Sequence, residues 1–172
     1  MKASVVMVLL WLATSAFAGV PGVLRTPSAV AAQIGAANEQ LLVMVPALRS
    51  LEIADALRKA AAERGVQVYM VVSAEHAEEP GSFVKTLALL EETVHVRLAI
   101  VDRAFIIGDR GTHAFLLEGE MLAQSSPTFD AKNTYAVRDS TTLARRGRLF
   151  EDVWLAAPPY RLGIETPPFR TP

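Results

Sequence analysis

Two side chains in the segment Val94–His113 have the types and the spacing that could do chemistry together. His95 and Arg97 stand two residues apart in an apolar run. In a β-strand alternate residues share a face, so the imidazole and the guanidinium would lie roughly 6–7 Å apart. A histidine titrates near neutral pH and can act as nucleophile or acid, and an arginine is a permanent cation that binds oxyanions through two donors. Asp102 follows where the run ends, which gives the spacing His-x-Arg-x4-Asp.

The elements that must position these residues are a buried strand, a tight turn at Asp102-Arg103 and a second short strand over residues 104–107. We expect the second strand to pair back on the first as a hairpin. The first strand would place one set of alternate residues against a core, namely Val94, Val96, Leu98 and Ile100. The opposite face would carry His95, Arg97, Ala99 and Val101.

A βαβ unit is predicted ahead of this segment. Residues 41–45 form a short apolar run, and residues 51–64 have helical spacing with Ser50 as N-cap and Gly65 as the stop. A second apolar run covers residues 66–72. Two strands joined by a helix predict a right-handed crossover and a parallel pair.

The remaining pattern extends this α/β arrangement. Residues 73–81 form a polar loop that holds His76, and residues 119–132 have no regular pattern. The other predicted elements are a helix over 29–38 capped by Ser28, a helix over 82–92, a weak strand over 114–117, an edge strand over 134–137, and a helix from Ser140 to about residue 155.

Composition indicates a single folded domain. The chain has 172 residues, of which 51% are hydrophobic and 20% charged. The net charge of −1 argues against a dedicated nucleic-acid binder, which usually has a basic excess. There is no cysteine, so the domain folds without disulfides.

The N-terminus has the features of a secretory leader. Lys2 precedes an apolar run, and Ala16-Phe17-Ala18 is a small-residue cleavage pattern. We predict a signal peptide over residues 1–18, a domain over 19–155 and a Pro-rich extended tail over 156–172. The mature protein would be periplasmic or secreted, without a transmembrane segment. The alternative is an uncleaved anchor, for which the run is short.

The spacing His95-x-Arg97-x4-Asp102 resembles the HxKx4D motif of the phospholipase D superfamily. The stretch RGVQVYMVV, from Arg64 to Val72, is also similar to the helix end and strand of that family. The resemblance covers Ser28 to Trp154 and is nearest to small secreted members with one motif per chain. It implies an α/β sandwich in which helices flank a mixed central sheet, and a two-fold homodimer that brings two motif copies together.

The resemblance also implies a mechanism. The motif histidine attacks phosphorus and forms a phosphohistidine, and the histidine of the second copy protonates the leaving oxygen. His95 would be nucleophile or acid, Arg97 the phosphate clamp and Asp102 a local orienter, with no metal and no cofactor. The substrate would be a phosphodiester, either a phospholipid or a nucleic acid.

The sequence departs from the family pattern at two places. Arg97 replaces the lysine, which is not a conservative change in a tight site. The family's GSxxN, seven residues after the aspartate, corresponds here to residues 109–113, which begin with Asp109 and end with His113. In that loop Arg110 could neutralise Asp109 and bind substrate, and His113 is either a substitute acid or an ordinary loop histidine. These departures leave a second hypothesis open: a catalytically inactive binding or scaffold protein of the periplasm.

Two other groups of residues have an ordinary interpretation and a functional one. His76 is either a loop histidine or a site residue at the carboxyl end of a strand. Arg145, Arg146 and Arg148 form either a solvated helix face or a contact for an anion or a nucleic acid.

Overall fold

The computed structural model describes residues 22–119, 122 and 134–162. The predicted leader, most of the irregular segment 119–132 and the tail from residue 163 lie outside the described residues. In chain order the elements are β1 (Gly22–Val23), α1 (Pro27–Gly35), β2 (Gln40–Val45), α2 (Leu51–Arg64), β3 (Gln67–Ser73), α3 (Ala74–Ala77), α4 (Val84–Ala88), β4 (Val94–Ala99), β5 (Phe105–Gly108), the 3-10 turn η1 (Gly111–His113), β6 (Phe115–Glu118), β7 (Tyr135–Val137) and α5 (Ser140–Ala156).

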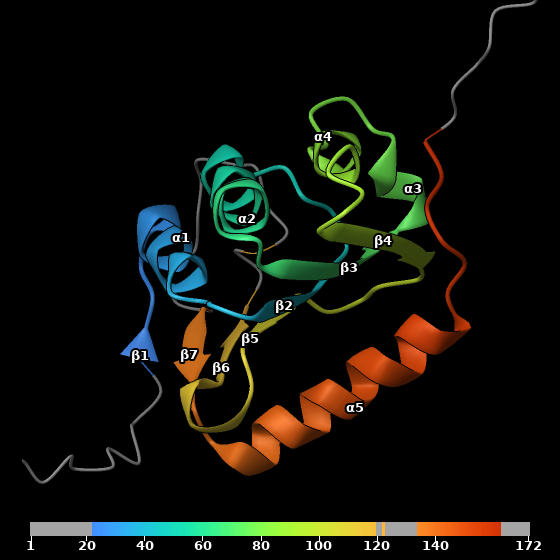
Figure 1. Cartoon of the computed structure of the whole chain (residues 1–172). Coiled ribbons are helices and arrows are strands. Elements are labelled where there is room, and N and C mark those ends of the chain that lie inside the picture. Colours follow the sequence, from blue (N-terminus) through green and yellow to red (C-terminus); the bar gives the residue numbers. More distant parts are fainter. Residues whose placement is uncertain (1–21, 120–121, 123–133, 163–172) are drawn as a thin grey trace, which may run out of the picture.

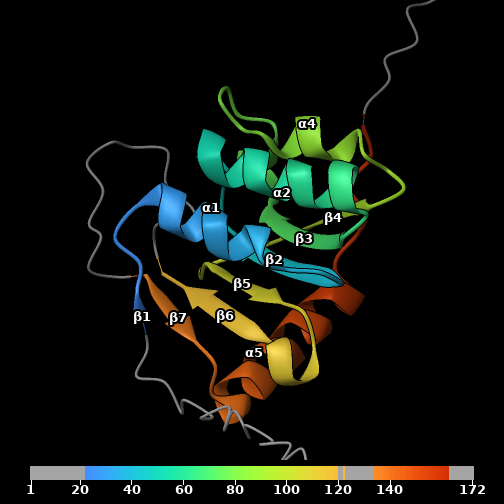
Figure 2. The ribbon, with the colours of Figure 1, turned by 60° about the vertical axis from the view of Figure 1, so that its left-hand side comes forward.

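The described strands form one mixed sheet in the order β1-β7-β6-β5-β2-β3-β4. β2, β3 and β4 are parallel neighbours, whereas β5, β6, β7 and β1 join by antiparallel pairing. Figure 1 shows α1, α2 and α4 on one face of the sheet and α5 on the other, and Figure 2 shows the same layers from the side. This confirms the predicted class, a mixed central sheet flanked by helices.

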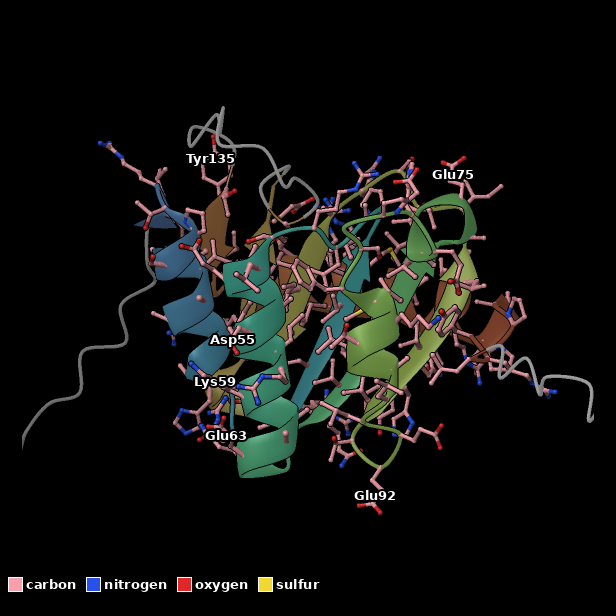
Figure 3. All side chains as sticks on the ribbon, turned by 90° about the horizontal axis from the view of Figure 1, so that it is seen from above. Asp55, Lys59, Glu63, Glu75, Glu92 and Tyr135 are labelled. Carbon is pink, nitrogen blue, oxygen red and sulfur yellow. The ribbon has the colours of Figure 1, made fainter. Side chains whose placement is uncertain are left out.

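Each face of the sheet has its own core. The larger core lies under α1, α2 and α4 and contains Val43, Leu57 and Val68. The smaller core lies under α5 and contains Met44, Phe105 and Phe150. The outer side of α2 is charged, and Lys59 and Arg58 form ion pairs with Asp55 there (Figure 3).

The predicted βαβ unit is confirmed. Ser50 caps α2 by accepting a hydrogen bond from the backbone N–H of Ile53, and Gly65 ends the helix with a left-handed φ of 69°. β2 and β3 pair in parallel from Gln40↔Gln67 onward. The residues at the two ends of the helix were therefore sufficient to predict this unit.

The predicted hairpin between β4 and β5 is wrong. β5 pairs with β2 and β6, and β4 lies three positions away at the end of the sheet. All four residues of β5 are buried. A strand buried on both faces needs a central place, and a two-stranded ribbon at an edge could not provide it.

Several element boundaries also differ from the prediction. Thr26 caps α1 in place of Ser28, since Pro27 occupies the first helical position. Asp139 caps α5 in place of Ser140. The helix predicted over 82–92 is reduced to α4, and α3 lies in the predicted polar loop. β4 ends at Ala99, and Ile100, which we expected in the core, is 99% exposed.

A buried carboxylate fixes the start of β2 against the end of β5. Asp109 is 5% exposed, has a φ of +56°, and accepts hydrogen bonds from the backbone N–H groups of Asn38, Glu39 and Gln40 at 2.8 to 3.4 Å. Its own N–H donates to the carbonyl of Gln40 at 2.9 Å. Successive N–H groups that converge on one carboxylate stabilise its charge without a cation.

Gly108, the neighbour of Asp109, must be a glycine because its cross-strand partner leaves no room for a Cβ atom. Gly108 lies opposite Phe115 on β6, and a Cβ at Gly108 would overlap the Phe115 ring. We expect Gly108→Ala to lower the free energy of unfolding by about 1–3 kcal/mol, measured by urea denaturation.

The matched control is Gly147→Ala in α5, where no heavy atom lies within 4 Å of the added Cβ. Alanine should raise stability there by about 0.5–1 kcal/mol. Equal effects of the two substitutions would contradict the packing of Phe115 on Gly108.

Candidate functional site

β4 brings His95 and Arg97 to one face of the sheet, as the alternation predicted. Both side chains are half-buried on the side covered by α5. The His95 ring lies 5.2 Å from the ring of Tyr69, its partner on β3, and its Nε2 is 3.4 Å from Oε1 of Gln67. β3 therefore supports the imidazole from one side.

The guanidinium of Arg97 is bound to the end of α5. Its Nη1 donates to the carbonyl of Trp154 at 2.6 Å and to the carbonyl of Ala157 at 3.1 Å. The group also lies 4.6 Å from the centroid of the Trp154 ring. The last carbonyls of a helix lack intrahelical partners and carry partial negative charge, so Arg97 acts as a C-terminal cap for α5.

Asp102 does not join His95 and Arg97. β4 ends at Ala99, and Asp102 is exposed in the connection to β5. In that connection Val101 turns into the core under α5, and its N–H donates to Oγ of Ser73. Within the described residues no hydrogen bond links Asp102 to either side chain of the predicted pair.

Arg110 and His113 lie in the connection between β5 and β6, and both are exposed. Three strand spacings separate β5 from β4, which places them roughly 14 Å from the strand of His95. The structure therefore brings together two of the five predicted site residues.

The other candidate groups are paired locally. His76 lies 2.9 Å from Glu79 and 3.3 Å from Glu75, and Glu79 also pairs with Arg49. Glu75 projects from the outer end of α3 (Figure 3). In α5, Arg146 is buried against Phe105 and paired with Glu118, whereas Arg145 and Arg148 are exposed.

Structural comparisons identify the architecture. Nuc from Salmonella typhimurium, a phospholipase D family member, superimposes with a TM-score of 0.59 at 20% identity, over 77% of this chain and 89% of its own. NucT from Helicobacter pylori gives 0.59 at 18% identity, over 76% and 88%. The chain has the phospholipase D fold.

The fold also occurs outside these two proteins. TrmBL2, an archaeal chromatin protein whose structure shows a mode of DNA binding, superimposes with a TM-score of 0.53 at 15% identity. The match covers 85% of this chain and 56% of TrmBL2. A scan against protein-family models and a search of curated proteins gave no match to the sequence.

In this phospholipase D fold the outer edge of β4 is partly covered by the residues that follow α5. Leu98 N–H donates to the carbonyl of Pro158 at 3.0 Å, and Tyr160 N–H donates to the carbonyl of Val96 at 2.8 Å. The Tyr160 hydroxyl reaches Glu78, and burial together with that carboxylate raises the pKa of Tyr160 to about 12. The first residues of the predicted tail therefore form a short strap, Pro158–Tyr160, antiparallel to β4.

A cavity of about 460 Å³ lies between β4, the end of α5 and the residues beyond the strap. His95, Arg97, Trp154 and Tyr160 line it, with Glu91 and Arg161 among the charged residues. Sequence reasoning missed Trp154 and Tyr160, because they reach β4 only through the fold. Among the described residues no group of His, Asp or Glu side chains could hold a metal ion, and no helix is long and apolar enough to cross a membrane.

The contacts of Arg97 lead to a stability prediction. Arg97→Met keeps the apolar stem but leaves two carbonyls without their donor, so we expect unfolding free energy to fall by about 1–3 kcal/mol in urea. Arg103→Met is the control, because Arg103 is exposed in the loop after β4. A loss no larger than that of the control would show that Arg97 does not hold the end of α5.

Proposed function

We propose that this chain is an exported phospholipase D-fold binding domain that does not hydrolyse phosphodiesters. The observation that carries the proposal is the engagement of Arg97 with two carbonyl oxygens and the Trp154 ring. A phosphate clamp needs N–H donors that are free to meet the ligand in a fixed geometry. Withdrawing Nη1 of Arg97 to reach phosphate would uncover carbonyl oxygens at the end of α5.

The position of the motif aspartate supports the same reading. Asp102 is exposed and makes no hydrogen bond to His95 among the described residues, whereas Asp109 is the buried and anchored aspartate of this region. Counting the spacing HxKx4D back from Asp109 gives Asp102 in the histidine position and Ala104 in the lysine position. Neither count supplies a histidine, a basic side chain and an anchored aspartate together.

A phosphodiesterase that acts through a phosphohistidine is the second candidate. One observation favours it: His95 and Arg97 share a face of β4 and line the same cavity. This candidate needs two copies of His95, and therefore a homodimer with a two-fold axis near β4. The strap Pro158–Tyr160 covers part of that edge, so a partner copy there would meet the strap as well as β4.

Hydrolysis distinguishes the two candidates. We expect the purified protein to give no turnover of bis-nitrophenyl phosphate above the blank, with or without EDTA, and Arg97→Lys to leave that result unchanged. Release of nitrophenol that is insensitive to EDTA, disappears in His95→Ala and accompanies a dimer in light scattering would establish the second candidate. His113→Ala is the matched control, because His113 is exposed and lies on another connection.

Export is proposed from the sequence of the leader. Lys2, the apolar run and Ala16-Phe17-Ala18 predict cleavage before Gly19. Mass spectrometry of the protein recovered from the periplasm or the medium should therefore find Gly19 at the N-terminus. An intact Met1 in the membrane fraction would support the anchor in its place.

A further inference from the structure

We propose that the edge of β4 at Val94–Val96 binds an extended peptide segment by strand addition, with an acidic side chain on the incoming segment. The inference rests on the proposed binding function and names its partner class. It is carried by an open pair of backbone groups, the cavity beside them and the charges around it.

The register of β4 defines which backbone groups face outward. Thr93 C=O accepts from Val68 N–H on β3, so the odd-numbered residues of β4 direct their backbone groups to β3. The even-numbered residues direct theirs to the edge. Among the described residues Val96 C=O and Leu98 N–H bond to the strap, whereas Val96 N–H and Val94 C=O have no backbone partner. A donor and an acceptor are thus available side by side.

The strap shows that this edge accepts an extended segment. Pro158 and Tyr160 make two ladder hydrogen bonds around the Arg97↔Pro159 pair. No further backbone bond to β4 follows Tyr160 within the described residues, although Leu162 still borders the cavity. The strap therefore occupies the edge from Leu98 to Val96 C=O, and the open half of the edge consists of Val96 N–H and Val94 C=O, which have no backbone partner among the described residues.

The open half coincides with the cavity of about 460 Å³, a size typical of ligand sites. Val94, His95 and Val96 form one wall, and Tyr160, Arg161 and Leu162 form the other. An extended segment placed there would meet the open donor and acceptor with its backbone and apolar surface with its side chains.

The charges of the cavity select the side chains of the segment. Of the ionised residues that line it, Arg97 and Arg161 are cationic and Glu91 is anionic. Arg161 is exposed, so its guanidinium is accessible to a partner. An acidic residue beside Arg161 would form a charge-assisted hydrogen bond, whereas a basic one would be repelled.

The test is selection of a random heptapeptide display library on the immobilised protein, followed by synthesis of the enriched peptides and titration in solution. We expect enrichment of peptides that carry Asp or Glu, and at least a tenfold loss of affinity when alternate peptide amides are N-methylated. Val96→Pro removes the edge N–H and also a buried side chain of the core, so its folding is checked by urea denaturation; the folded variant should weaken binding at least tenfold.

Arg161→Glu tests the same groove without a backbone change and should also weaken acidic peptides at least tenfold. Arg148→Glu, on the exposed side of α5, is the charge-matched control and should leave affinity within twofold. The absence of enrichment, or binding that neither Val96→Pro nor Arg161→Glu changes, would overturn the inference. If wild type is a dimer that Val96→Pro makes monomeric, the occupant is a second copy and the peptide partner is overturned.

The outcomes separate this inference from the proposed function. If the protein has no phosphodiesterase activity and enriches no peptide, the peptide inference is wrong and the non-catalytic function still stands. A protein that hydrolyses bis-nitrophenyl phosphate in a His95-dependent way loses the proposed function, whatever the peptide result.

Discussion

The carboxylate of Asp109 joins the two halves of the sheet. It accepts backbone N–H groups from Asn38, Glu39 and Gln40 at the point where β2 begins, and it directly follows the last residue of β5. β2 is the strand at which parallel pairing on one side gives way to antiparallel pairing on the other. Within the sheet, β6 and β7 connect to the parallel strands only through the β2–β5 pair that this carboxylate bridges. A buried charge satisfied by backbone donors tolerates few alternative positions, so it specifies the arrangement as well as stabilising it.

The parts of the fold that could be predicted are those whose signals are local. β2, α2 and β3 follow from two apolar runs, Ser50 before the helix and Gly65 after it. Two helices begin one or two residues away from their predicted caps, because a neighbouring residue competes for the cap position. Thr26 caps α1 because a proline follows it at the first helical position, and Asp139 caps α5 by accepting from Thr142 N–H. Such shifts leave the helix in place, because the buried face and not the cap decides its packing.

The position of β5 could not be predicted from local sequence. A turn-like Asp102-Arg103 between apolar runs indicates a hairpin, yet hairpin partners must share an edge of the sheet. Phe105 and Ile107 are buried under α5, whereas Ile106 is buried under α1, α2 and α4. β5 therefore needs strands on both sides and helices on both faces, and β2 and β6 provide the strand neighbours. The signal that could have revealed this is the absence of any polar residue in β5, which is unusual for an edge strand.

In the candidate site, too, local sequence predicts the contacts between neighbouring residues but not those between distant ones. Strand alternation correctly placed His95 and Arg97 on one face, because that depends on two residues of spacing. It could not reveal that Trp154 and Ala157, 57 and 60 residues further along the chain, supply carbonyl oxygens to Arg97. The type and spacing of residues define what a site could bind, but only unsatisfied donors are available to a ligand. In this chain Nη1 of Arg97 already donates to two carbonyl oxygens, whereas the backbone N–H of Val96 has no backbone partner among the described residues.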